Sequence, residues 1–487
     1  MYRNKSANDH LWCITKEKLE QNMAKLFYTR AEELYDRRFD AEYHCALKDV
    51  RLSSAYPLTK LLSLASFRTG GTPSTEVEDY WNGDIPWVSA KDFRAFRFED
   101  SEDHITEKAI TDGTTYFVSR PALLVVSRSG ILQHTLPVMV THRPTAINQD
   151  IKAFFPDNRV TVDYLGVFFD VFGSRLLPLL CKSGATVQSL NTKELIALRI
   201  PIPPREVQAR IVAELDAAYA AKRKADKKAA ELLASIDDFV LDALGIPPLP
   251  PPDTSLPARI FTVSSRDVAD DRLDPYYYQR SFRITAKTIA KDARLTRLGS
   301  VGTFVRGVTY SAEDEAPDGF AILRASNVKL ETGEIDLSDL LYVRKELVFD
   351  DSQLVKQGDI LICAASGSKE HAGKVAYVEP DLKDTYIGGF MTVLRVSKTI
   401  VNPRYAAVYM QSQLFRRLIL RHLGGTNINN VSLSLLNSLP ILIPERSVQE
   451  EIVARVSAIR TEARTLKAEA VANLAAAKSR IEKQLLT

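Results

Sequence analysis

The amino-acid sequence repeats itself with a period of about 240 residues. FRTGGTPSTE at Phe67–Glu76 matches FVRGVTYSAE at Phe304–Glu313, an offset of 237 residues. Near the end of each half, LRIPIP at Leu198–Pro203 matches LPILIP at Leu439–Pro444, an offset of 241 residues. Solenoid repeats are only about 20–50 residues long, so each unit here is the size of a domain. Two similar units predict pseudo-twofold symmetry and a target with two similar halves, such as double-stranded DNA.

Basic and acidic residues nearly balance, with 64 Lys and Arg against 61 Asp and Glu. This balance excludes a histone-like protein and an acidic tail, but not DNA binding, because charge can be segregated on one face. The four cysteines form no CxxC pair and no HExxH occurs, so no metal site is expected. Sparse cysteines, no signal peptide and no long apolar run predict a cytoplasmic protein that does not enter a membrane.

Each half opens with a mixture of short apolar runs and helical stretches. The runs at Leu123–Val126 and Ile360–Ile362 predict buried strands, because turn-forming residues bound such runs. The stretches Tyr164–Leu177 and Tyr405–Leu420 are expected to be helices. This mixture predicts an α+β fold class with two pseudo-symmetric globular domains.

Each half closes with a long amphipathic helix. In the second half, apolar residues recur at alternating steps of three and four: Val448, Ile452, Val456, Ile459, Ala463, Leu466, Ala470, Leu474, Ala477, Ile481 and Leu485. Subtracting 241 gives a matching stripe from Val207 to Leu244, interrupted only by Lys222. This spacing predicts a coiled-coil seam in which each helix is the partner of the other. The proline-rich segment Pro247–Pro252 follows the first helix as a semi-rigid spacer.

Several longer segments carry a family resemblance. They are GGTPS at Gly70–Ser74, YWNGDIPWVSAKD at Tyr80–Asp92, AINQD at Ala146–Asp150, VQSLN at Val187–Asn191, ILRASNV at Ile322–Val328 and GGTNIN at Gly424–Asn429. In this combination the sequence resembles the specificity subunit of type I restriction-modification systems, over residues 37–487.

The resemblance implies a non-catalytic subunit with two target-recognition domains, each reading one half of a bipartite double-stranded DNA site. It implies that the two long helices pair antiparallel and fix the gap between the half-sites. Two methyltransferase subunits are expected to dock on these helices, and restriction/translocase subunits to join for cleavage. The resemblance gives this chain no cofactor of its own, and S-adenosylmethionine is expected in the methyltransferase partner.

The predicted domain organisation follows from the repeat and the resemblance together. It comprises an N-terminal helical extension (1–36), target-recognition domain 1 (37–204), a long spacer helix (205–246), a Pro-rich linker (247–270), target-recognition domain 2 (271–444) and a second spacer helix (445–487). Within the extension, Lys16–Arg37 is expected to be helical, with Leu19, Met23, Leu26 and Phe27 on one face.

Candidate base-reading residues are polar side chains in the loops that follow the strands, because Arg or Lys reads guanine and Asn or Gln reads adenine in the major groove. In the first half they are Ser89, Lys91, Arg94, Arg128, Ser129, Gln133 and Gln188. In the second half they are Arg324, Ser326, Asn327, Ser366, Ser368, Lys369, Asn427 and Asn429.

Some features allow a second interpretation. Gly70 and Gly71 could cradle a phosphate, but a plain turn is favoured; Trp81 and Trp87 could stack on a base, but packing in the core is favoured. The basic cluster on the first helix, defined as Lys222, Arg223, Lys224, Lys227 and Lys228, is either a solvated face or a phosphate contact.

Rival functions differ in what they require. A methyltransferase needs an Asn/Asp-Pro-Pro-aromatic loop, and the nearest match, NPRY at Asn402–Tyr405, lacks the second proline. No GxxxxGK[ST] phosphate loop of a motor is present. Two rivals stay open: a specificity subunit whose partner fuses methyltransferase and nuclease, and a coiled-coil scaffold that binds no DNA.

Overall fold

The computed structural model describes residues 54–181, 188–251, 253, 255–268, 274–330, 332–423 and 429–486, together with the backbone of two short strands nearer the N-terminus. The chain divides into two compact units. The first unit comprises Met1–Arg223 and Ala470–Thr487, and the second comprises Lys224–Glu469. Each unit therefore contains one end of each long helix.

The two N-terminal strands correct part of the sequence prediction. Strand β1 (Leu11–Ile14) pairs antiparallel with β2 (Phe27–Arg30). The helix predicted over Lys16–Arg37 is therefore wrong at Phe27–Arg30, where the run Phe-Tyr-Thr favours a strand. The rest of that prediction lies outside the described residues.

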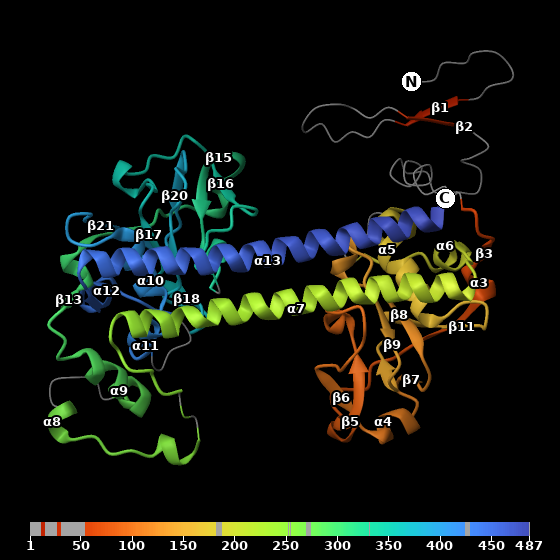
Figure 1. Cartoon of the computed structure of the whole chain (residues 1–487), viewed down its shortest axis with the longest axis horizontal. Coiled ribbons are helices and arrows are strands. Elements are labelled where there is room, and N and C mark those ends of the chain that lie inside the picture. The colour runs from red at the N-terminus through yellow and green to blue at the C-terminus, as the bar shows by residue number, and fades with distance from the viewer. Residues whose placement is uncertain are drawn as a thin grey trace. The chain divides into compact units, whose positions relative to one another are not determined.

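Two four-stranded sheets form the body of the first unit (Figure 1). One has the order β4 (Ala65–Thr69), β11 (Ile151–Pro156), β8 (Ala122–Val126), β9 (Val138–Thr141), and all its neighbours are antiparallel. The other has the order β6 (Asp103–Ile105), β5 (Trp81–Val88), β10 (Thr145–Ile147), β7 (Tyr116–Val118), and its β5 and β10 are parallel. Helix α5 (Val162–Leu180) packs on one face of β8 and β9, and residues of the second sheet pack on the other face of β8, so every residue of β8 is buried.

The second unit repeats this topology. Its four-stranded sheet has the order β14 (Gly302–Arg306), β21 (Met391–Val396), β17 (Ile360–Cys363), β19 (Val375–Tyr377). Its second sheet has the order β16 (Leu341–Val343), β15 (Glu315–Leu323), β20 (Thr385–Ile387), and again contains one parallel pair, β15 with β20. The shared strand order confirms the duplication and the α+β fold class.

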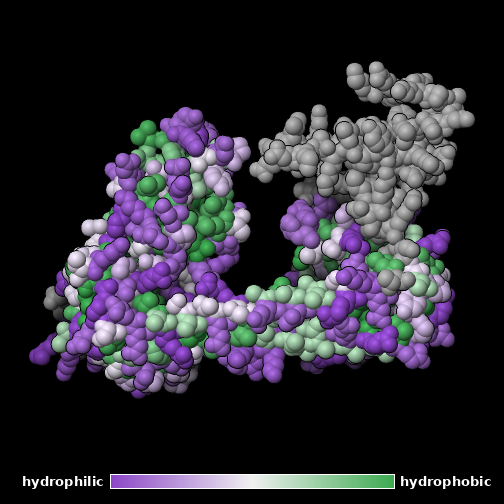
Figure 2. Space-filling view, turned by 45° about the horizontal axis from the view of Figure 1, so that its top comes forward, coloured by the Kyte–Doolittle hydropathy of each residue, from purple (hydrophilic) through white to green (hydrophobic). Residues whose placement is uncertain are grey.

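A further two-stranded sheet joins the start and end of each globular body. In the first unit β3 (Leu58–Lys60) pairs with β12 (Arg199–Pro201), and in the second β13 (Leu295–Arg297) pairs with β23 (Pro440–Leu442). Both pairs lead directly into a long helix. Hydrophilic residues predominate on the face of each unit drawn in Figure 2, with hydrophobic patches between them.

The remaining helices are shorter. In the first unit they are α3 (Leu61–Leu64), α4 (Glu107–Thr111) and α6 (Thr192–Ala197). In the second unit they are α8 (Ser265–Val268), α9 (Arg280–Ile289), α10 (Pro403–Gln411), α11 (Gln413–Leu420) and α12 (Leu433–Ser438). No helix in the described part of the chain combines the length and the hydrophobicity that a membrane crossing needs.

Helices α7 (Arg205–Ala243) and α13 (Arg446–Leu486) are the two long helices that the apolar stripes predict. Every stripe position is buried or half-buried, and Lys222 is half-buried as well. In the first unit Ile211 of α7 and Ile481 of α13 belong to one hydrophobic core. In the second unit Val240 and Ile452 do the same, while Lys228 approaches Glu462 at 4.0 Å. Residue numbers rise along one helix as they fall along the other, so the segments pair antiparallel there.

A buried glutamine fixes the start of each long helix. Gln208 donates to the carbonyl of Pro203 at 3.0 Å, and its Oε1 accepts from the amide of Thr161, which caps α5. Gln449 donates to the carbonyl of Pro444 at 2.8 Å, and its Oε1 accepts from the amide of Asn402, which caps α10. Buried polar groups are costly unless they are hydrogen-bonded, and these two are satisfied in the same way.

Candidate nucleic-acid interface

In the first unit, the ends of several strands meet at the turn between β10 and β11. The amide of Asn148 in this turn donates to the carbonyl of Val88, the last residue of β5, at 3.0 Å. The amide of Ser127, just after β8, donates to the carbonyl of Asp150 at 2.7 Å. We call the loops gathered at this turn the first reading edge: residues 89–94, 127–133, 148–150 and 188–190. All seven candidate residues of the first half lie on it.

Three candidates on this edge are engaged by acidic neighbours. The amide and Oγ of Ser89 both donate to Asp92, at 2.8 and 3.0 Å, which caps a short 3₁₀ turn. Lys91 pairs with Asp103 at 2.8 Å and Glu102 at 3.1 Å, and the hydrogen bonds that it donates to these carboxylates raise its pKa. Glu102 also accepts from Arg94. These partners hold the two cations at the surface, where ion pairs are weak and exchangeable.

The other four candidates on the first reading edge are placed by backbone contacts. The amide of Ser129 donates to the carbonyl of Gln188 at 3.1 Å, and Ser129 caps the turn that ends at Gln133. Arg128 forms a β-bridge with Ser189 through its backbone. The side chains of Arg128 and Gln133 are exposed. The structure thus brings Arg128, Ser129, Gln133 and Gln188 together.

The second unit has an equivalent edge, at the turn between β20 and β21. The amide of Gly388 donates to the carbonyl of Leu323, the last residue of β15, at 2.9 Å. Strand β18 (Ala365–Ser366) follows β17 and pairs with β22 (Asn429–Asn430), which sets Ser366 opposite Asn429. We call this the second reading edge: residues 324–327, 364–369, 388–390 and 429–430.

Asn327 serves the fold rather than the surface. It is 2% exposed, and its amide donates to the carbonyls of Asp336 and Asp339, both at 2.9 Å. Its Oδ1 accepts from the amide of Arg324 at 2.8 Å. These bonds use its side-chain donors and its acceptor, so Asn327 would have to leave the core to reach a base.

The remaining second-half candidates are at or near the surface. Arg324 pairs with Asp339 at 3.2 Å, and Ser326 is exposed. Ser368 accepts from the amide of Glu370 at 3.2 Å, and Lys369 lies 4.3 Å from the ring centre of Tyr276. Asn427 lies outside the described residues, and Asn429 is placed by its backbone alone.

The comparisons with known proteins bear on both edges. Residues 58–232 and 291–472 each match the family described as the type I restriction modification DNA specificity domain. These two segments cover more than two thirds of the chain. The chain belongs to this family.

Similar curated proteins are described as specificity subunits of type I restriction enzymes. The type I restriction enzyme EcoR124I/EcoR124II specificity subunit of Escherichia coli is 38% identical over 148 residues, or 30% of this chain and 37% of that protein. The StySPI specificity subunit of Salmonella potsdam is 32% identical over 175 residues, or 35% and 37%. The matched part of the chain thus spans little more than a third of each relative.

Among solved structures, the S subunit of a type I restriction-modification system from M. genitalium is 12% identical with a TM-score of 0.41, covering 90% of this chain and 98% of its own. A structure described as showing complex assembly and conformational transition of the type I R-M system is 14% identical with a TM-score of 0.46, covering 89% and 97%. At these TM-scores we base no argument on either likeness.

The second reading edge also exposes an apolar residue, Phe390, which the polar candidates chosen from the sequence do not include. Phe390 is 73% exposed, although its carbonyl accepts from the amides of Ala364 and Ala365 at 2.8 and 3.1 Å. The corresponding residue of the first half is Asp150, whose carbonyl accepts the equivalent bond from Ser127. The same backbone turn thus presents a carboxylate in one half and a phenyl ring in the other. Aligning AINQD with YIGGF at 386–390 would have revealed this difference.

Two segments that carry the family resemblance, GGTPS and YWNGDIPWVSAKD, pack against the end of β10 next to the first reading edge. A Cβ on Gly70 would lie 1.7 Å from the carbonyl oxygen of Ile147, and the amide of Gly71 donates to that same oxygen at 3.0 Å. Trp87 is 7% exposed and donates to the carbonyl of Gly71 at 3.1 Å. Trp81 packs edge-on against Trp87, with ring centres 5.3 Å apart. These contacts favour the structural interpretation of both glycines and both tryptophans.

Four residues of the basic cluster on α7, Arg223, Lys224, Lys227 and Lys228, are exposed, whereas Lys222 is half-buried. Lys227 approaches Glu231 at 3.9 Å with both side chains exposed, and Lys228 is also mostly exposed. Within the described residues, no group of three His, Cys, Asp or Glu side chains is placed to hold a metal ion.

Proposed function

We propose that this chain is the DNA sequence-recognition subunit of a type I restriction-modification complex and performs no chemistry itself. The observation that carries the proposal is the pair of reading edges. Both use one backbone frame, a parallel strand pair joined to an antiparallel sheet, but present different side chains. A shared frame with different side chains suits a protein that reads two different half-sites of one DNA.

The surface chemistry of the edges supports base readout. Both edges carry donors of the kind that reads purines in the major groove. They are Arg128 and Gln133 on the first edge and Arg324 and Ser326 on the second. Phe390 adds an apolar group that suits a thymine methyl or an unstacked base. Asn327 leaves the set of proposed readers because its side chain is buried.

The partners belong to the same proposal. Two methyltransferase subunits would dock on the long helices and bind S-adenosylmethionine, and restriction/translocase subunits would join them in the cytoplasm. The domain boundaries proposed above assign residues 37–204 and 271–444 to recognition and the two helices to spacing. A partner that fuses methyltransferase and nuclease remains the second candidate, and the neighbouring genes would distinguish the two.

The test is methylome sequencing of a host that expresses this chain with its methyltransferase partner. We expect methylation at one bipartite motif with a fixed gap. A DNA-independent scaffold would leave no motif, and a gel shift with and without the partner would then show no sequence preference.

The helices offer a separate test of spacing. Inserting four residues near Lys224 lengthens α7 by about 6 Å, close to two base pairs of DNA. A four-residue insertion is a tolerated stutter in a helical seam. We expect both half-site sequences to survive while the gap grows by one or two base pairs. An active insertion variant with an unchanged gap would refute the helices as a ruler.

A further inference from the structure

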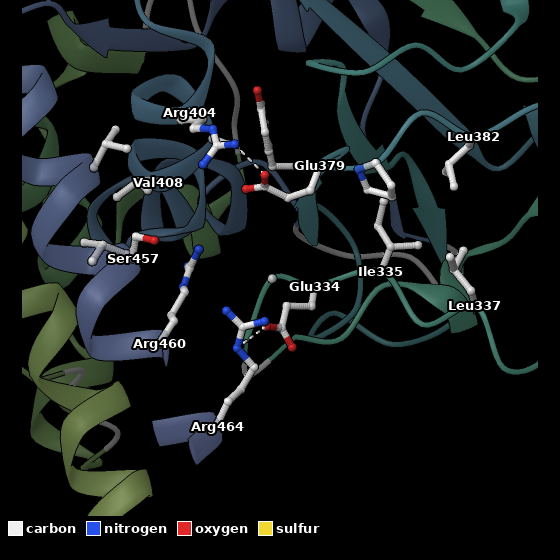
Figure 3. A pocket seen from close by; sticks show the side chains of 16 residues that line it. Glu334, Ile335, Leu337, Glu379, Leu382, Arg404, Val408, Ser457, Arg460 and Arg464 are labelled. Carbon is white, nitrogen blue, oxygen red and sulfur yellow. Dashed lines mark hydrogen bonds and ion pairs between the residues drawn. The ribbon is translucent and has the colours of Figure 1, made fainter. Parts of the chain in front are cut away.

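The second unit contains a cavity of about 590 Å³ beside α13 (Figure 3). Helices α10 and α13 form one wall, and segments 333–337 and 377–382 form the other. This volume lies within the range of small-molecule sites, roughly 300–1,000 Å³. None of the residues that line the cavity belongs to the second reading edge.

Three arginines and two glutamates line the cavity. Arg404 pairs with Glu379 at 2.6 Å, and Arg464 pairs with Glu334 at 3.5 Å. The dashed lines in Figure 3 mark these two pairs, and none reaches Arg460. The charged lining therefore carries one positive charge more than it carries negative charges.

Arg460 is the unmatched cation. Its Nη2 donates to the neutral Oε1 of Gln411 at 2.6 Å, and its buried Nε has no hydrogen-bond partner. Burial lowers its pKa, but an arginine guanidinium stays charged in proteins. A buried charge is costly unless a counter-charge is hydrogen-bonded to it.

At the equivalent position of the first unit, the side chains of the protein itself occupy the space and balance the charge. Position 460 corresponds to Tyr219, whose ring stacks on Phe96 with centres 5.4 Å apart. Beside it Arg97 binds both Asp163 and Asp216, the latter at 2.9 and 2.6 Å. There the guanidinium binds two carboxylates. In the described part of the second unit no carboxylate is hydrogen-bonded to Arg460, because its neighbours Glu334 and Glu379 are paired with Arg464 and Arg404.

Apolar side chains complete the cavity. Val408 and Val456 are buried in the helical wall, which also contains Val453, and Ile335 and Leu337 lie on the opposite wall. A planar guanidinium binds a carboxylate through two parallel hydrogen bonds. We propose that this cavity binds a small organic carboxylate, with its head group on Arg460 and its apolar body against the valines.

The test uses the full chain, purified with its methyltransferase partner, and three probes: 4-phenylbutyrate, the neutral 4-phenylbutan-1-ol and acetate. We expect 4-phenylbutyrate to raise the unfolding temperature with a saturable concentration dependence. The alcohol and acetate should give no shift at the same concentrations. Equal shifts from carboxylate and alcohol, or no saturable shift from 4-phenylbutyrate, would overturn the proposal.

Two variants sharpen the test. Arg460→Met should weaken 4-phenylbutyrate binding at least tenfold, while Arg455→Met, an exposed position on the same helix outside the cavity, should leave it unchanged. Without a probe, Arg460→Met should unfold at the wild-type temperature or higher, because it removes a half-buried cation whose buried Nε has no hydrogen-bond partner. A clearly lower unfolding temperature would show that Arg460 serves the fold and would overturn the site. DNA binding need not change in any of these experiments.

Discussion

The two globular bodies meet their long helices through the same buried hydrogen bonds but through different ion pairs. Gln208 and Gln449 make equivalent bonds, and so do Tyr164 and Tyr405, whose hydroxyls donate to the carbonyls of Pro201 and Leu442 at 2.6 and 2.7 Å. The ion pairs of Arg97 in the first unit are reversed relative to those of Arg404 and Arg464 in the second, whereas the pair of Lys478 with Asp170 is not. In the first unit Arg97 of the globular body pairs with Asp163 on α5 and Asp216 on α7. In the second unit Arg404 on α10 and Arg464 on α13 pair with Glu379 and Glu334 of the globular body.

This difference distinguishes the buried hydrogen bonds, which both copies of the fold require, from the ion pairs, which can differ between the copies. A buried glutamine with every bond satisfied cannot be replaced without leaving partners unpaired. A partly exposed ion pair contributes little, so its sign can reverse between copies. The halves therefore share a frame and differ in the side chains around it, at the helix contact as at the reading edges.

The largest effect is expected from the shared frame. Ile211→Asp and Ile452→Asp each place a charge in a fully buried position of a helix contact, at a cost on the order of 4 kcal/mol. We expect a large fall in unfolding temperature and loss of methylation at both half-sites together. Ala454→Asp, at an exposed position of α13, is the matched control and should behave as wild type. Retained activity and stability in Ile452→Asp would contradict burial of the stripe.

A smaller effect is expected from the charge clamp of the first unit. Arg97→Ala removes the donor of Asp216 and one of the two donors of Asp163, and should lower the free energy of unfolding by about 1 kcal/mol. Arg460→Met in the second unit should cost nothing. An equal decrease in the free energy of unfolding for both substitutions would contradict the claim that Arg97 stabilises the fold and Arg460 does not.

The same clamp predicts a pH dependence. Burial raises the pKa of Asp163, but hydrogen bonds from Arg97 and His142 outweigh it and hold the pKa below its usual value. A depressed carboxyl pKa stabilises the fold above the unfolded value, near 3.9, and the effect is lost as pH falls through the folded value. The stability gap between wild type and Arg97→Ala should therefore be constant near neutrality and shrink below about pH 4. Unfolding measured from pH 7 to pH 3 checks this, and a gap that widened toward low pH would contradict it.

The smallest effect on stability is expected at the second reading edge. Phe390→Ala should weaken binding of the specific DNA by about 1–2 kcal/mol, roughly tenfold, and relax the sequence of one half-site only. Val348→Ala is the control, since Val348 is 95% exposed and comes after Val343, which pairs with Glu315 and Phe320 of β15 and not with its last residue, Leu323. Fluorescence anisotropy with specific and scrambled DNA measures both. Unchanged affinity in Phe390→Ala beside weakened binding in Arg324→Ala would reject Phe390 as a contact and leave DNA recognition standing.

The sequence was sufficient for features that depend on periodicity and order. The stripe from Val448 to Leu485 was predicted position by position, because only one face of a long helix can be buried against a partner. The repeated landmarks likewise predicted two bodies of one topology. The strand at Phe27–Arg30 was predicted as a helix, because four apolar residues in a short window fit either period.

Residue roles at the reading edges were harder to predict. Asn327 has the right chemistry for adenine, but its side chain caps a turn in the core, and composition cannot distinguish the two roles. Phe390 is not among the candidate base-reading residues because an aromatic residue in a strand-rich segment is expected to be buried. The bond from Arg97 to Asp216 joins residues 119 positions apart, and no local pattern reveals such a pair.

The central claim is that each half of the chain reads one half-site. Exchanging residues 57–200 for those of a family member with a different motif tests it most directly, with methylome sequencing of a host that expresses the chimera and its partner. We predict that one half-site takes the donor's sequence, while the other half-site and the gap stay as they were. A change in both half-sites, or in neither, would contradict the claim.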